Sequence, residues 1–333
     1  MSRLLLLCLP LVIACTIPTK LIMAQNTIGK IERLTPQMDS LVPQSSAIEV
    51  LASGFTWTEG PVWMGGKDGH LLFSDIPRNT IFKWEQDGTV SVFMTPSGYT
   101  GVTYYGLEPG SNGLFLDNAG RLAMCEHGDR RVSVLTDNGG KITLADRHNG
   151  KRFNSPNDGA LKSNGDIYFT DPPYGLPERF TDPRREIPYC GVYRVDTEGE
   201  VTLLTKSIER PNGIAFSPDE TALYVAQSNP EEANWTKFPV NADGTLGAGV
   251  EFYNATDRVN KEPGLPDGMT TDADGNLWAS GPGGIYVFND AGTLLGRLVT
   301  NERTSNCSFG PDGYLYMTVD ARLCRVKTNA RTK

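Results

Sequence analysis

Short apolar runs rich in β-branched and aromatic residues alternate with turn signals along this chain, and no long stretch has the spacing of an amphipathic helix. The runs come in pairs, such as HLLFSDI before TIFKWEQDGTVSVF, RLAMCE before RVSVLTDNGGKITLA, and DIYFTD before GVYRVDTEGEVTLLT. Each hairpin turn carries glycine beside Asp, Asn or Glu, as in Asp87-Gly88, Gly139-Gly140 and Glu198-Gly199. This pattern predicts an all-β fold built from antiparallel hairpins.

The paired runs repeat along the chain. Six copies begin with a polar residue followed by an apolar strand: EGPVWM at 59, NGLFLD at 112, NDGALK at 157, NGIAFS at 212, DGMTTD at 267 and NCSFGP at 306. The copies are spaced by about 39 to 55 residues, which is the length of one four-stranded blade or a little more. The repeats predict a six-bladed β-propeller. Other repeating β architectures could also place strands at this spacing.

The last repeat fixes how the ring is expected to close. Residues 305–328 have room for only three strands, so the apolar run IEVLASGF at residues 48–55 is predicted to supply the fourth strand from the N-terminal side. The propeller is therefore expected to span residues 48–328. Residues 25–47 are interpreted as an extension or linker, and residues 329–333 as a tail.

The first residues have the pattern of a targeting segment. Arg3 precedes an apolar run at residues 4–14, which is too short to span a bilayer and has the length of a secretory signal core. We expect residues 1–24 to act as a signal and the protein to be exported, either periplasmic or secreted. Two cleavage sites stay open: after Ala24, or before Cys15 in the lipoprotein-like box VIAC, which would place a lipid anchor on Cys15.

Charge and composition narrow the class of partner. The net charge is −8 and basic residues do not cluster, which argues against a nucleic-acid partner because such binding neutralises phosphates. Gly (36) and Pro (22) are abundant, as in a turn-rich β fold. A small molecule is the expected partner. No protein partner is implied, and a membrane would be contacted only through the anchor at Cys15.

The cysteines of the propeller do not form a metal-site or disulfide pattern. Each lies in or beside a strand-like run, and none belongs to a CxxC pair: Cys125, Cys190, Cys307 and Cys324. An oxidising compartment would permit disulfides, but buried free thiols are the expected state.

Polar residues recur at the start of the first strand of every repeat. In a propeller these strands line the channel, so their equivalent ends face one another across it. The aligned positions hold Glu59, Asn112, Asn157 with Asp158, Asn212, Asp267 and Asn306. One Asn or Asp before glycine is explained by turn chemistry. Six at the same phase are not, and they predict a polar ring in the channel.

The chemistry of this ring favours a cation. Carboxylates buried together repel one another, and a bound cation removes that conflict. Glu59 and Asp267 supply two charges, Asn157 and Asn212 supply amide oxygens, and no His or Cys is present at these positions. All-oxygen ligands favour Ca²⁺ before Mg²⁺. Mn²⁺ and Zn²⁺ stay open, with Zn²⁺ disfavoured.

Several of these segments together resemble a known family. TEGPVW, SPNDGA, RPNGIAFS and LPDGMTTDADGNLW resemble the SMP-30/gluconolactonase/LRE-like family, and FSDIPRNTIFKW, CEHGDRRV and FTDPPYGL are similar to its bacterial gluconolactonase branch. The resemblance covers residues 48–328. It implies a six-bladed propeller with one divalent metal in the channel and hydrolysis of sugar lactones. It also implies a metal site of Glu59, Asn157, Asn212 and Asp267, with Asp267 as the catalytic base.

Further polar residues follow the second strands, whose loops are expected to border the channel entrance. The candidates for substrate binding are Asn157, Asp75, Arg78, His127, Arg130 and Tyr174. For two of them a structural role is an open alternative: Arg130 with Arg131 as a solvated pair on a hairpin, and His127 in a structural hydrogen bond.

The leading functional hypothesis is an exported, Ca²⁺-dependent lactonase, most simply one that converts D-glucono-1,5-lactone to gluconate. A hydrolase of another lactone or of a phosphotriester stays open, as does a ligand-binding propeller with a structural ion. The sequence contains no GxSxG elbow and no GxGxxG loop, which disfavours serine-esterase chemistry and a nucleotide site.

Overall fold

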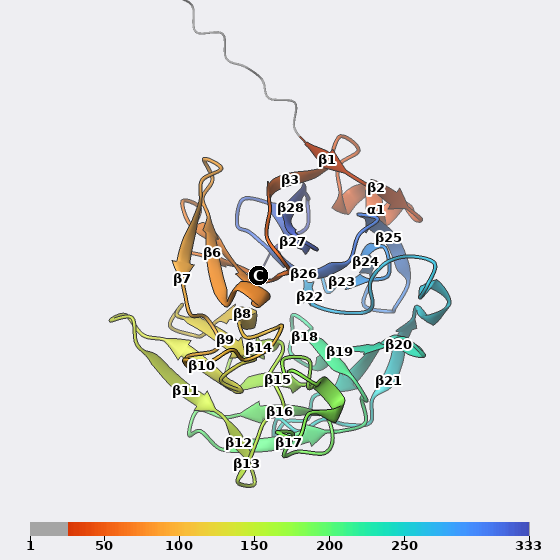
Figure 1. Ribbon diagram of the computed structural model, residues 1–333. Coiled ribbons are helices and arrows are strands. Elements are labelled where there is room, and N and C mark those ends of the chain that lie inside the picture. The colour runs from red at the N-terminus through yellow and green to blue at the C-terminus, as the bar shows by residue number, and fades with distance from the viewer. Residues whose placement is uncertain (1–25, 333) are drawn as a thin grey trace, which may run out of the picture.

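Six antiparallel sheets surround a central channel in this computed structural model, which describes residues 26–332 (Figure 1). From the channel outwards, the first three blades consist of β4 (Thr58–Met64), β5 (His70–Asp75), β6 (Thr80–Trp84) and β7 (Val90–Met94); β8 (Ser111–Leu116), β9 (Leu122–Glu126), β10 (Arg131–Leu135) and β11 (Lys141–Ala145); and β14 (Gly159–Leu161), β15 (Ile167–Asp171), β16 (Gly191–Val195) and β17 (Val201–Thr205). The fourth to sixth blades consist of β18 (Pro211–Phe216), β19 (Ala222–Asn229), β20 (Glu232–Pro239) and β21 (Val250–Asn254); β22 (Met269–Thr271), β23 (Leu277–Gly281), β24 (Gly284–Phe288) and β25 (Leu294–Val299); and β26 (Thr304–Phe309), β27 (Tyr314–Val319), β28 (Arg322–Lys327) and β3 (Ile48–Ser53).

The remaining elements are short. They are the strands β1 (Thr27–Ile28) and β2 (Lys30–Arg33), the helix α1 (Pro36–Leu41), the hairpin of β12 (Arg147–His148) and β13 (Lys151–Arg152), and the 3-10 turns η1 (Ile76–Arg78), η2 (Arg179–Thr181) and η3 (Thr256–Arg258). No helix in the described part of the chain has the length and apolar character needed to cross a bilayer.

Blade geometry follows from local sequence. Central strands such as β5, β9 and β15 are buried along nearly their whole length, as expected for strands packed between neighbouring blades. The hairpin turns use the predicted glycines. Gly88 and Gly199, for example, have φ values of 91° and 86°, a region open mainly to glycine. The predicted β-propeller is therefore confirmed.

The ring closes as predicted. The innermost strands β4, β8, β14, β18, β22 and β26 contact one another in sequence, and β26 contacts β4. The strand β3 pairs with β28 as the fourth strand of the last blade, with Leu323 opposite Ala52 and Cys324 opposite Val50. Because this pairing joins the two ends of the propeller, it fastens the ring non-covalently.

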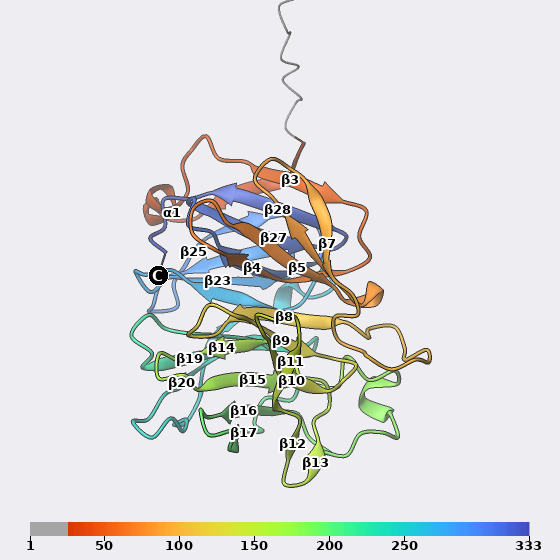
Figure 2. The same cartoon turned by 90° about the vertical axis from the view of Figure 1, so that its left-hand side faces the viewer.

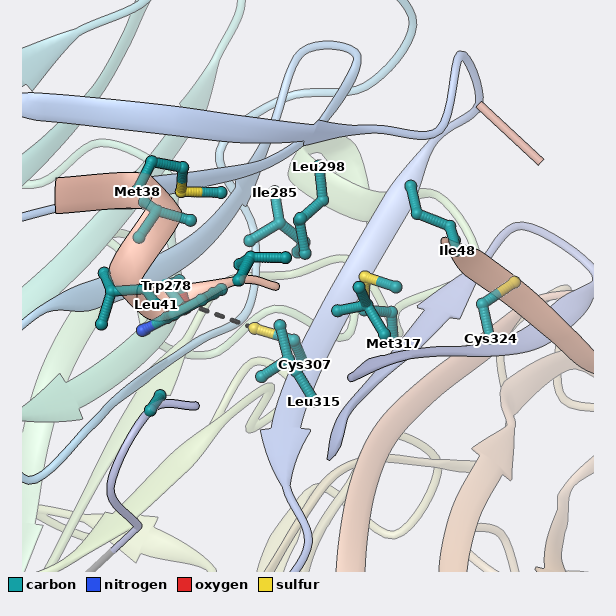
Figure 3. Close-up of a cluster of buried hydrophobic side chains, with 14 of the residues drawn as sticks. Met38, Leu41, Ile48, Trp278, Ile285, Leu298, Cys307, Leu315, Met317 and Cys324 are labelled. Carbon is teal, nitrogen blue, oxygen red and sulfur yellow. Dashed lines mark hydrogen bonds between the residues drawn. The ribbon is translucent and has the colours of Figure 1, made fainter. Parts of the chain in front are cut away.

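The segment interpreted as an extension is folded onto the propeller. β1 adds a fifth strand to the last blade beside β3, and β2 adds a fifth strand to the neighbouring blade beside β25. Between them and β3, Met38 and Leu41 of α1 pack into an apolar cluster with Trp278 and Cys307, where Cys307 Sγ lies 3.3 Å from the Trp278 carbonyl oxygen (Figure 3). The N-terminal segment thus joins two blades through both pairing and packing.

The predictions for the cysteines and the N-terminus have different outcomes. Cys125, Cys190, Cys307 and Cys324 are buried free thiols, which confirms their predicted state. The predicted signal at residues 1–24, the cleavage sites and Cys15 lie outside the described residues. The tail is held at the surface, because Asn329 N donates to the Leu41 carbonyl oxygen over 2.9 Å.

Candidate active site in the channel

A cavity of about 720 Å³ opens at one mouth of the channel. Seen from the side, the orange turn η1, the loop after β7 and the green turn η2 lie along the same edge of the molecule (Figure 2). The polar and aromatic residues that line the cavity include Trp57, Glu59, Glu108, Asn112, Asn157, Tyr174, Arg179, Arg210, Asn212, Ser228, Lys261, Glu262, Asp267 and Arg303.

Glycines after the polar residues bring neighbouring strands close together. A Cβ on Gly60 would lie 2.4 Å from the Asn112 carbonyl oxygen, and one on Gly213 would lie 2.2 Å from the Asp267 carbonyl oxygen. A Cβ on Gly268 would lie 1.9 Å from Asn306 Cγ. These contacts explain why an acidic or amide residue followed by glycine recurs in the repeats.

Irregular strand pairing also shapes the channel mouth. The register shifts between Glu59 and Val62 in β4, and equivalent shifts occur at the starts of β8, β18 and β26. A bulge of this kind bends a strand and redirects its side chains. These bulges lie beside Glu59, Asn112, Asn212 and Asn306 and help to orient those side chains, whereas β14 and β22 pair without such a shift.

The four predicted metal ligands all line this cavity, and these four residues are referred to as its floor. Glu59, Asn157 and Asn212 are 2%, 3% and 6% exposed, and Asp267 keeps partial exposure to the cavity. Asn212 Nδ2 donates to Ser228 Oγ over 2.9 Å, whereas its Oδ1 is buried without a hydrogen-bond partner. An unpaired acceptor that lines the same cavity as two carboxylates is a group that a cation shared with them would satisfy.

The pKa shifts of Glu59 and Asp267 also favour a cation site here. Burial raises the pKa of Glu59 to about 8, and the nearby Asp158 carboxylate adds to the rise. Burial and then repulsion from Glu59 raise the pKa of Asp267 well above its ordinary value. Two carboxylates that resist ionisation beside each other form a site that fits a hard divalent cation, because its charge favours both ionised forms.

A third carboxylate lies deeper in the channel. Asp158 Oδ2 is 3.5 Å from Asn306 Nδ2, and burial raises the pKa of Asp158 to about 7. Both residues line a smaller cavity, of about 220 Å³, at the other end of the inner strands. Within residues 26–332 no three His, Cys, Asp or Glu side chains are grouped as a metal site, so a metal at the floor depends on the amides as well.

Besides Asn157, two of the predicted substrate-binding residues lie at or just behind the cavity wall. Tyr174 lines the cavity, and its pKa is raised first by burial and then by Asp267. His127 is fully buried behind the wall, and its Nε2 lies 3.3 Å from Nδ2 of Asn112, which does line the cavity. His127 thus contacts the cavity-lining residue Asn112 and does not itself line the cavity.

Three others bind main chain outside the cavity lining. Asp75 accepts the N–H groups of Thr56 and Trp57 over 3.0 and 3.2 Å, and Arg78 Nη2 donates to the Gly54 carbonyl oxygen over 2.7 Å. Both therefore hold the segment that carries Trp57 to the cavity.

Arg130 has an equivalent arrangement on the next blade. It is 5% exposed, and its Nε donates to the carbonyl oxygens of Phe153 and Asn154 over 2.7 and 3.1 Å. The guanidinium is thus buried against main chain rather than solvated on a hairpin. It fixes the segment that leads through Asn157 into the inner strand β14.

Some lining residues were not predicted. Glu108 comes from the loop between β7 and β8, Arg179 from the loop between β15 and β16, and Lys261 from the loop between β21 and β22. The only sequence signal for them is the length of these connections, since long loops between regular elements often carry functional residues. Their side chains belong to no repeat position.

Known proteins share this architecture and sequence. The family model described as the SMP-30/Gluconolactonase/LRE-like region matches residues 57–321. A gluconolactonase from Zymomonas mobilis subsp. mobilis is 40% identical over 314 residues, covering 91% of this chain and 87% of that protein. The pentonolactonase XacC from Haloferax volcanii is 28% identical over 276 residues, covering 78% and 80%.

A solved structure agrees with these sequence matches. A gluconolactonase from Xanthomonas campestris superposes with a TM-score of 0.78 at 30% identity, covering 92% of this chain and 99% of that one. The family model covers most of the propeller, including the start of every innermost strand around the channel. The resemblance found in the sequence motifs is confirmed: the chain belongs to the SMP-30/gluconolactonase/LRE-like family.

Proposed function

We propose that this chain hydrolyses sugar lactones, most simply D-glucono-1,5-lactone to gluconate. The observation that carries the proposal is that Glu59, Asn157, Asn212 and Asp267 line one cavity, in a chain 40% identical to a gluconolactonase. Polar groups around a concave site of this volume suit a small hydroxylated substrate.

The floor residues would hold a divalent cation, Ca²⁺ before Mg²⁺. When bound, such an ion polarises the lactone carbonyl and stabilises negative charge on its oxygen. Asp267 takes the proton of the attacking water as general base, since it is the floor carboxylate that keeps exposure to the cavity. Asn157 and Tyr174 orient the sugar hydroxyls, and Glu59 holds the ion rather than moving protons.

A lactone panel tests this proposal. Wild type and Asp267→Asn are assayed on aldonolactones of five and six carbons, other lactones and a phosphotriester, before and after treatment with a chelator. We expect wild-type hydrolysis of at least one sugar lactone, a loss of at least about 100-fold in kcat for Asp267→Asn, and recovery by added Ca²⁺ after chelation.

The panel also separates the alternatives. Full activity after verified metal removal would contradict the cation's role but leave lactone hydrolysis standing. Hydrolysis of the phosphotriester alone would replace the substrate class. Inactivity on every substrate, together with calorimetric binding of a sugar acid, would favour a ligand-binding propeller instead.

A further inference from the structure

Glu108 brings a further carboxylate into the cavity from outside the repeat pattern. Its side chain is 22% exposed and lines the same cavity as Glu59 and Asp267. Arg179 Nη2 lies 3.3 Å from Glu108 Oε1, and His127 Nδ1 lies 3.6 Å from Glu108 Oε2. The carboxyl group therefore accepts a hydrogen bond from Arg179 and lies beside the His127 ring, while it lines the cavity.

The histidine in this arrangement has a defined orientation. Asn112 Nδ2 lies 3.3 Å from His127 Nε2, so the amide donates to that nitrogen and the ring proton resides on Nδ1, facing Glu108. Nδ1 is buried and has no hydrogen-bond partner. Burial lowers the pKa of His127 to about 3, so the ring is a neutral N–H donor near neutral pH.

Lactone hydrolysis needs two proton transfers, and the residues of the proposed function supply one. Asp267 removes a proton from water as the new C–O bond forms. When the tetrahedral intermediate collapses, the bond between the carbonyl carbon and the ring oxygen breaks, and its electron pair goes to the ring oxygen. An alkoxide is a poor leaving group, so a general acid at this oxygen accelerates the step.

We propose that Glu108 is that general acid and delivers the proton to the leaving ring oxygen. The inference rests on the proposed lactonase function. After the transfer, the Glu108 carboxylate is stabilised by Arg179 and by His127 N–H, and it regains a proton from cavity water. The proton taken by Asp267 returns to solvent, so the cycle closes without a further reactant.

The surroundings of Glu108 suit a carboxyl group that carries a proton between turnovers. Burial raises its pKa against the opposing effect of Arg179. The charged and titratable groups around it are Arg179, His127, Glu59 and Asp267. If Glu108 served only to pair with Arg179, it would not need to line the cavity, as it does.

The test compares Glu108→Gln with wild type on two lactones that differ in leaving group. D-glucono-1,5-lactone releases an alkoxide, whereas dihydrocoumarin releases a phenoxide that needs far less help from an acid. We expect kcat of Glu108→Gln to fall about 10² to 10³-fold on gluconolactone and less than about tenfold on dihydrocoumarin. Glu198→Gln, a change at an exposed glutamate in the turn between β16 and β17 and outside the cavity lining, is the matched control.

A pH profile on gluconolactone alone gives a second readout. A general acid works only while protonated, so the alkaline fall in wild-type kcat should vanish in Glu108→Gln and return, shifted, in Glu108→Asp. Unchanged kcat on gluconolactone, or an equal loss on both lactones with a raised KM, would overturn the role of Glu108 while the lactonase function stands. A wild type inert on every lactone would overturn both.

Discussion

At the scale of single residues, space rather than charge decides how the channel floor is assembled. Gly213 lies directly beside the main chain of Asp267, and its φ is not in the left-handed region, so its role is to leave room rather than to turn the chain. The position of Asp267 therefore depends on the lack of a Cβ atom at Gly213 in the neighbouring blade.

Gly213→Ala should disturb the floor without removing a functional group. The added Cβ would lie 2.2 Å from the Asp267 carbonyl oxygen, so one of the strands must shift. We expect the free energy of unfolding to fall by about 1–3 kcal/mol, as for other overpacked sites, with a further loss in kcat. Urea unfolding and lactone assays measure both. Gly66→Ala is the control, since nothing lies within 4 Å of a Cβ there.

His127 should make stability depend on pH. Burial lowers its pKa to about 3 in the folded chain. Between pH about 6.5 and 3 the unfolded chain binds a proton that the folded chain does not, so the free energy of unfolding falls as pH drops, by up to about 1.4 kcal/mol per pH unit. The contribution is complete above pH about 6.5.

Unfolding at pH 7, 6 and 5 tests this dependence. His127→Gln should lose stability less steeply than wild type as pH falls, whereas His148→Gln, on the β12–β13 hairpin, should follow wild type. Equal slopes for wild type and His127→Gln would show that the folded ring titrates normally.

At the scale of elements, one arginine ties the wall of the cavity to the N-terminal strand. Arg297 of β25 is 4% exposed and contacts Glu262 over 2.6 Å and Glu32 of β2 over 2.8 Å. Glu262 belongs to residues 259–265, which line the cavity. The loop is thus positioned by a strand from the opposite end of the chain.

Arg297→Met should loosen this loop. The change keeps much of the buried side-chain volume but removes the buried cation from two glutamates, which keep only the more exposed Lys30 and Arg258. We therefore expect a loss of about 2–4 kcal/mol in unfolding free energy and a raised KM for lactone. Arg322→Met, which removes a more exposed pair with Glu302, should cost less than about 1 kcal/mol and leave KM unchanged. Similar effects of the two changes would contradict the role of the buried pair.

At the scale of the whole molecule, closure and reinforcement of the ring come from different N-terminal strands. β3 completes the last blade, while β1 and β2 add fifth strands outside two blades that are already complete. Ile28 and Ile31 pack on the apolar cluster shared by those blades. We therefore expect loss of β3 to prevent cooperative folding, and loss of β1 and β2 only to lower the free energy of unfolding.

Two truncations distinguish these roles. A chain that starts at Leu34 loses β1 and β2, and with them two partly buried isoleucines, so we expect a loss of roughly 2–4 kcal/mol with the fold retained. A chain that starts at Gly54 loses α1 and β3 as well and should show no cooperative unfolding transition. Circular dichroism during denaturation measures both, and equal stability of the two chains would contradict the closing role of β3.

Much of the fold could be read from local patterns. Strand alternation and glycine turns depend on neighbouring residues, so the six repeats and the channel-facing positions of Glu59, Asn157, Asn212 and Asp267 were predictable. The predicted closing strand also follows from the repeat, because the last copy lacks its fourth strand. The metal and catalytic roles of these residues stay predictions.

The sequence by itself determined the blades, their number and the phase of the polar ring, because period-two alternation and turn chemistry act over a few residues. Only the tertiary structure decided that Asp75, Arg78 and Arg130 bind main chain and that residues 26–34 pair with two blades. It also decided that Glu108 stands between Arg179 and His127. These outcomes depend on contacts between residues far apart in the chain, where loops have no repeating pattern to reveal their path.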